Sequence, residues 1–133
     1  MFIHLDWCPT ASNRILTTEH DLKFDLPNVS FGSSDYEISV KQCLIVWEQA
    51  VNSLYGILRS TIIDKSVFNP TRQLLAFSQN KKSNFLLHTP VNREAYLIQR
   101  QDLQTAEFHL TLSERHKIEK IKLILEIINV DRN

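Results

Sequence analysis

The sequence predicts a protein built mainly of β-strands, in the form of a β-sandwich or barrel. Turn-forming residues recur at short intervals, and the segments between them are rich in β-branched, aromatic and leucine residues. Several of those segments also alternate apolar and polar positions, which is the period of a half-buried strand. The turn signals are Cys8-Pro9, Leu26-Pro27-Asn28, Gly32 to Asp35, Asn69-Pro70, Asn80 to Asn84 and Thr89 to Asn92. No linker, low-complexity segment or internal repeat interrupts the 133 residues, so we expect one domain over residues 1–133.

The alternating segments, taken in chain order, are 21–26, 36–41, 96–98, 107–112 and 121–128. In the first of them Leu22, Phe24 and Leu26 alternate with charged residues. The same period holds for Phe108, Leu110 and Leu112 further along the chain. Each of these segments is therefore predicted to be a strand with one face in the core.

A helical alternative exists for two parts of the chain. The apolar residues Val40, Cys43, Trp47, Ala50, Val51, Leu54, Leu58 and Ile62 recur every three or four positions, as on an amphipathic helix. Residues 114–128 contain a shorter pattern of this kind. The turn-prone pair Asn52-Ser53 and the many isoleucine and valine residues favour strands instead. From the pattern alone, an all-β fold and an α+β fold with a long helix near residues 40–63 both remain open.

Composition and charge exclude several classes of function. Fifteen basic and 15 acidic residues give zero net charge, which argues against a protein that mainly grips nucleic acid or an anionic membrane. With only two glycines, no phosphate-binding glycine motif is possible. Cys8 and Cys43 stand 35 residues apart and are expected to be free thiols in a reducing compartment. The N-terminus is unlike a signal peptide and no apolar stretch is long enough to span a bilayer, so we expect a soluble protein made in the cytoplasm.

The residues available for catalysis form no recognised motif. The five histidines are His4, His20, His88, His109 and His116, and no H-x-H metal pair occurs among them. Glu19 and Asp21 flank His20, and Glu107 stands two positions before His109, so a metal site would need a distant pairing of these groups. There is no nucleophile elbow either. We therefore expect no enzyme activity, no metal site and no cofactor.

One stretch carries a family resemblance. Tyr55, the pair Ile63-Asp64, a loop over residues 65–72 and the pair Leu74-Leu75 follow one another as strand, loop and strand. In this respect residues 36–128 resemble the penton-type minor capsid proteins of Polinton-like elements, adintoviruses and related small DNA viruses, which are single jelly rolls. The resemblance implies a jelly-roll β-sandwich of about eight antiparallel strands. It therefore favours the all-β fold over the α+β fold.

The resemblance also implies a function. It predicts a structural subunit that associates with copies of itself in a ring, pentameric if penton-like, and with other capsid proteins at a virion vertex. Large aromatics are favoured at such contacts, which makes Trp7, Trp47 and Phe68 the candidate subunit-contact residues, although core packing is an alternative for each. Two alternatives are a small cytosolic α+β protein-interaction module, immunity or antitoxin-like, and a metal-dependent hydrolase that uses the histidines.

Overall fold

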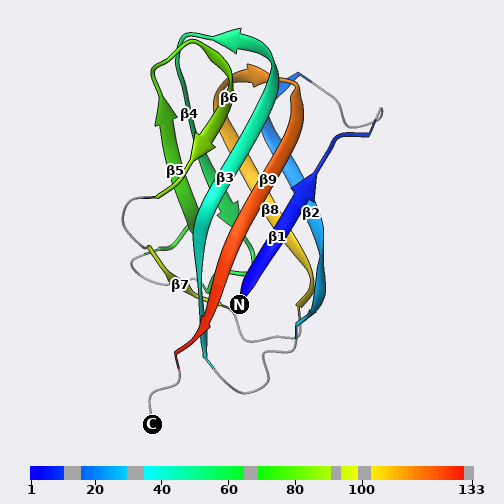
Figure 1. Ribbon diagram of the computed structural model, residues 1–133, viewed down its shortest axis with the longest axis vertical. Coiled ribbons are helices and arrows are strands. Elements are labelled where there is room, and N and C mark those ends of the chain that lie inside the picture. Colours follow the sequence, from blue (N-terminus) through cyan, green and yellow to red (C-terminus); the bar gives the residue numbers. More distant parts are fainter. Residues whose placement is uncertain (11–15, 30–34, 65–68, 91–93, 99–102, 131–133) are drawn as a thin grey trace.

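The computed structural model describes residues 1–10, 16–29, 35–64, 69–90, 94–98 and 103–130, and within them the chain forms strands and no helix (Figure 1). The strands are β1 Phe2–Trp7, β2 Thr17–Val29, β3 Tyr36–Val51, β4 Leu54–Ser60, β5 Gln73–Gln79, β6 Ser83–His88, β7 Tyr96–Leu97, β8 Leu103–His116 and β9 Ile118–Asn129. They lie in two antiparallel sheets that pack face to face (Figure 1). No helix of the described residues is long and apolar enough to cross a membrane.

The strand order within the sheets is that of a jelly roll. One sheet runs β1-β9-β3-β6, with the short β7 also paired to β3, and the other runs β2-β8-β4-β5. The pairs β1 with β9, β2 with β8, β3 with β6 and β4 with β5 are nested in the chain, as in one long hairpin. Pairing of β3 with β9 and of β4 with β8 wraps that hairpin into two layers. The prediction of an all-β jelly-roll sandwich of about eight antiparallel strands is confirmed.

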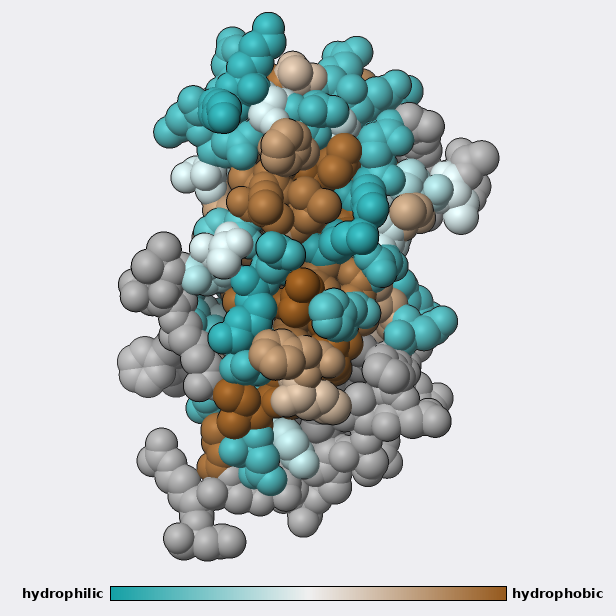
Figure 2. Space-filling view, viewed as in Figure 1, coloured by the Kyte–Doolittle hydropathy of each residue, from teal (hydrophilic) through white to brown (hydrophobic). Residues whose placement is uncertain are grey.

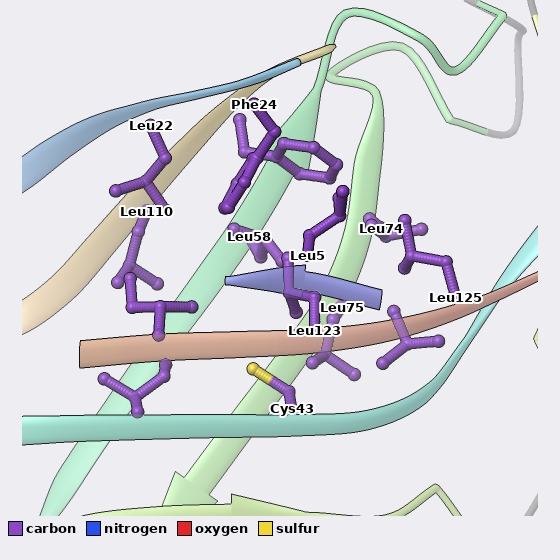
Figure 3. Packing of buried hydrophobic residues seen from close by; sticks show 14 of the residues in the cluster. Leu5, Leu22, Phe24, Cys43, Leu58, Leu74, Leu75, Leu110, Leu123 and Leu125 are labelled. Carbon is purple, nitrogen blue, oxygen red and sulfur yellow. The ribbon is translucent and has the colours of Figure 1, made fainter. Parts of the chain in front are cut away.

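The core lies between the two sheets, where their inner side chains meet (Figure 3). Leu22 and Phe24 of β2 face inward beside Phe108 of β8, and the two phenylalanine rings meet edge to face with centroids 5.4 Å apart. From the other sheet, Cys43 of β3 and Leu123 of β9 point into the same layer (Figure 3). Burial of one such leucine or phenylalanine side chain stabilises the fold by roughly 1.5–3 kcal/mol, so this layer holds the sheets together.

The helical alternative is wrong for both segments. Residues 40–63 contain most of β3, a bend at Asn52-Ser53 and all of β4, while residues 114–128 belong to β8 and β9. A small α+β module is thereby excluded as a description of this chain. The break predicted at Asn52-Ser53 is confirmed, because this pair separates β3 from β4.

Two β-bulges explain why strands resembled helices in the sequence. In β3, Val40 pairs with Leu125 and Gln42 with Ile124, so Lys41 is an extra residue and the inward positions Val40 and Cys43 stand three apart. A second shift between Val46 and Trp47 leaves Ile118 and Ile121 of β9 three apart as well. A bulge adds one residue to a strand, so the inward-facing positions after it switch between odd and even residue numbers. The mixed spacing that results imitates the three-and-four spacing of a helix.

The turn predicted at Leu26-Pro27-Asn28 is wrong, because β2 continues to Val29. The pairing of β2 with β8 shifts between Asp25 and Val29, and β2 is the last strand of its sheet. Proline lacks an N–H donor and is tolerated at such an irregular place on an edge strand. The turn signals at residues 32–34 and 91–92 lie outside the described residues.

Candidate functional site

The outer face of the sheet β2-β8-β4-β5 carries a charged groove. Outward side chains of neighbouring strands stand opposite one another, with Asp21 of β2 facing His109 of β8 and His109 facing Arg59 of β4. Next to this row, Lys23 of β2 faces Glu107 of β8. The groove has a volume of about 580 Å³ and extends to Thr61, Thr71 and Arg72.

The acidic side of the groove lies at the sheet edge. Nδ1 of His109 is 2.6 Å from a carboxylate oxygen of Asp21, and its Nε2 is 3.9 Å from a carboxylate oxygen of Glu19. Asp21 is largely exposed, because β2 is the edge strand, whereas about a third of the His109 side chain is exposed. The imidazole therefore bridges two carboxylates that are otherwise in water.

The basic side of the groove lies over β4 and the start of β5. The guanidinium of Arg59 donates a hydrogen bond to Oγ1 of Thr111 at 3.2 Å. Ser60, buried next to it, donates from its hydroxyl to the backbone carbonyl of Glu107 at 2.9 Å. The N–H of Thr61 donates to the same carbonyl, which ties the end of β4 to β8. The strand end that presents Arg59 is therefore held against β8.

Arg72 is placed by a tight turn. The side-chain oxygen of Asn69 accepts from the N–H of Gln73, and its amide nitrogen donates to the carbonyl of Gln73, both at 2.9 Å. Arg72 has a φ of 56°, in the left-handed region that a residue with a side chain adopts at a cost. Its Nε is buried and has no hydrogen-bond partner among the described residues. The turn thus holds this guanidinium at the groove although the backbone there is strained.

The other sheet has a different surface, with large apolar side chains at both of its edges. Met1 and Phe2 are exposed at the β1 edge, and Phe85, Leu87 and Leu97 are exposed at the opposite edge, formed by β6 and β7; all five are between 49% and 58% exposed. On the outer face, Phe85 stands opposite Val46 and Leu87 opposite Leu44. Figure 2 shows apolar surface gathered over β3 and β6 on this side of the molecule.

The three aromatics predicted as subunit contacts are not brought together. Trp47 is fully buried, with its ring 5.8 Å from that of His116, so a contact role at the surface is wrong for it. Trp7 ends β1 and is partly exposed while it packs against the core. Phe68 lies outside the described residues.

The residues considered above as metal ligands are partly brought together. The pairing of β2 with β8 joins Glu19 and Asp21 to His109, whereas the ring of His20 turns inward and its Nε2 lies 3.1 Å from the carbonyl of Thr17. Among the described residues no group of three histidine, cysteine or acidic side chains is arranged to hold a metal ion. Cys8 and Cys43 are free, and burial raises the pKa of the Cys43 thiol to about 12.

Sequence reasoning missed Arg59 and Arg72 as members of a site. Arg59 stands at an outward position of an apolar strand, where a solvated cation is ordinary, and the φ of Arg72 cannot be inferred from residue types. The turn signal Asn69-Pro70 was the available clue, because it places Arg72 immediately before β5.

Comparisons with known proteins identify no family for this chain. No protein-family model and no curated protein matches the chain. Among solved structures, the chain is similar to a carbohydrate-binding module, CBM28, described as specific for non-crystalline cellulose; identity is 12%, with 90% of this chain and 69% of that chain covered and a TM-score of 0.35. A similarity of this size identifies neither a family nor a ligand.

Proposed function

We propose that this protein is a structural subunit that assembles with copies of itself into a ring, as a penton-like minor capsid protein does at a virion vertex. The observation that carries the proposal is the position of the exposed apolar side chains at the two opposite edges of one sheet. The jelly-roll strand order and the resemblance over residues 36–128 support it.

A ring requires each copy to use two different surfaces. In a heterologous contact, one patch meets a different patch on the next copy, and the chain of copies closes when the rotation fits. The edge with Phe85 and Leu87 is one such patch, and the edge with Phe2 is the other. Water is removed from apolar surface when they meet, which is the main driving force for association. Zero net charge adds no long-range repulsion between copies.

The β6 edge is arranged for side-chain packing rather than for addition of another strand. The carbonyl of Phe85 accepts hydrogen bonds from the Ser83 hydroxyl at 2.9 Å and the Gln79 amide at 3.0 Å. Its N–H donates to the Ser83 hydroxyl at 3.1 Å. These side chains occupy backbone groups that a neighbouring strand would otherwise use. The contact is therefore expected to consist of Phe85 and Leu87 packed against the next copy.

Sedimentation over a wide range of protein concentration tests the proposal. The expected result is a closed oligomer, five copies if the ring is penton-like. Phe85→Glu places a charge in the contact and is expected to give monomers, whereas Tyr55→Glu, on the exposed outer face of the other sheet, leaves the ring intact. A wild-type protein that stays monomeric at the highest concentration, or a Phe85→Glu variant that assembles normally, contradicts the proposal.

Disulfide trapping tests the pairing of unlike edges. Cys8→Ser first removes the exposed native thiol. In this background, Phe2→Cys and Leu87→Cys are made in separate proteins. A heterologous ring is expected to form cross-links when the two proteins are mixed and oxidised, and far fewer in either alone. Equal cross-linking within each protein alone would instead indicate a two-fold contact between like edges.

A further inference from the structure

The charges in the groove on the sheet β2-β8-β4-β5 are unevenly compensated. Asp21 is paired with His109, and Lys23 stands opposite Glu107. Arg59 and Arg72, in contrast, have no carboxylate of the described residues within ion-pairing distance. Two guanidinium groups therefore line one side of the groove, and no described carboxylate pairs with either of them.

The backbone holds these two groups at a cost. Arg59 pairs with Gln73 whereas Leu58 pairs with Leu75, so Leu74 is an extra residue that bulges β5 beside the groove. The carbonyl of Arg72 accepts from the N–H of Ser60 at 3.1 Å, which ties the two arginine-bearing segments together. Bulges and left-handed residues other than glycine are found where a chain must direct a side chain to a functional place. Here both lie within a few residues of the two arginines.

The arrangement indicates the chemistry of a ligand. An arginine presents a planar fork of N–H donors that fits a carboxylate or phosphate group. The Nε of Arg72 is buried and none of the described residues accepts a hydrogen bond from it. On the opposite side, Asp21 and Glu107 accept hydrogen bonds and would repel a second negative group. Thr61 and Thr71 also line the groove and add hydroxyls. A bare polyanion fits this set poorly, whereas a ligand with one oxyanion and several hydroxyl donors satisfies it.

We propose that the groove binds a small hydroxylated oxyanion, a sugar acid or a sugar phosphate, with its charged group between Arg59 and Arg72 and its hydroxyls toward Asp21 and Glu107. The volume of about 580 Å³ suits a ligand of one or two sugar rings. The site lies on the sheet that the proposed ring leaves uncovered, so it stands independently of the proposed assembly.

Isothermal titration calorimetry tests the proposal with four probes: glucuronate, glucose 6-phosphate, glucose and inorganic phosphate. We expect measurable binding of one or both charged sugars, at least about tenfold tighter than that of glucose or inorganic phosphate. The comparison of glucuronate with glucose 6-phosphate identifies the preferred oxyanion. Absence of binding by both charged sugars, glucose binding as tightly as they do, or inorganic phosphate binding as tightly as they do would each overturn the proposal.

Variants locate the binding and separate it from folding. Arg72→Gly removes the guanidinium and permits the positive φ, so the protein is expected to fold while affinity falls about tenfold or more. Arg59→Gln is expected to weaken binding similarly, and Arg115→Gln, an exposed arginine that does not line the groove, is the matched control with unchanged affinity. Full affinity in a folded Arg72→Gly variant, or an equal loss in Arg115→Gln, would show that the ligand does not sit between Arg59 and Arg72.

Discussion

Gly56 is closely packed by its neighbours, and its replacement by alanine gives a quantitative test of the fold. β4 is flanked by β5 and β8, and Gly56 stands between Phe77 and Leu112. A Cβ at this position would lie 2.7 Å from Cζ of Phe77, 2.8 Å from the backbone oxygen of Thr111 and 3.0 Å from Cδ2 of Leu112. Ordinary contacts between carbon atoms are about 3.5–4.0 Å, so all three atoms would have to move.

The expected cost follows from two opposing terms. Overpacking of a core by one methyl group costs about 1–3 kcal/mol, and here one of the three atoms belongs to the β8 backbone, which cannot rotate away. The lower conformational entropy of unfolded alanine returns about 0.4–1 kcal/mol. We expect Gly56→Ala to lower the free energy of unfolding by about 1–2 kcal/mol. Chemical denaturation measures this change.

Two further variants make the test specific to the contacts. Ser78→Ala, on the exposed face of β5, is the control and is expected to change stability by less than about 0.5 kcal/mol. Phe77→Leu removes the Cζ atom, so Gly56→Ala is expected to cost less in that background than in the wild type, while the clash with the Thr111 oxygen remains. A Gly56→Ala protein as stable as the wild type would refute the packing described for β4.

Three other predictions concern buried groups. Burial lowers the pKa of His20 and His116 below 6.5, so in acid the unfolded chain binds more protons than the folded protein. We therefore expect stability to fall as the pH drops below about 6.5. A melting temperature unchanged between neutral and mildly acidic buffer would contradict this. A thiol-specific reagent is expected to modify Cys8 rapidly and Cys43 only on unfolding, because Cys43 is buried and its thiol has a pKa of about 12. Modification of both cysteines at the same rate in the native protein would contradict the burial of Cys43. Leu110→Ala is expected to lower the free energy of unfolding by about 2–5 kcal/mol in chemical denaturation, and a loss below about 1 kcal/mol would show that this position is not in the core.

Much of the fold could be predicted because alternation survives wherever a strand is regular. Leu22, Phe24, Phe108, Leu110 and Leu112 are all buried as their period of two requires. The prediction weakened where strands are irregular. A bulge at Lys41 shifts the inward-facing positions of β3 by one residue, and the residue types there do not predict a bulge. Pattern alone could therefore not choose between strand and helix over residues 40–63.

The groove was less predictable because its members come from different strands. Asp21 and His109 are 88 positions apart, and only the register of β2 against β8 brings them to 2.6 Å. The sequence singles out both residues, but only as groups that a metal site would have to pair over a long distance along the chain. Arg72 depends on a backbone conformation that a turn and a bulge impose, which no local pattern specifies. A site whose residues come from different strands depends on the register of strand pairing, and the sequence alone does not specify that register.

The two faces of the sandwich differ in chemistry in a way that one function does not explain. A subunit that only assembled would need apolar contacts at the edges of β1 and β6, and nothing in that role calls for two uncompensated arginines on the opposite sheet. Strain at Arg72 reduces stability, and so does a buried guanidinium nitrogen that has no partner in the part of the chain that the structure describes. A mutation could remove both if they served no purpose. In the proposed ring, contacts at the edges of β1 and β6 would leave the outer face of β2-β8-β4-β5 open. A ring built in this way would present one groove per subunit, which turns a weak single site into a multivalent surface.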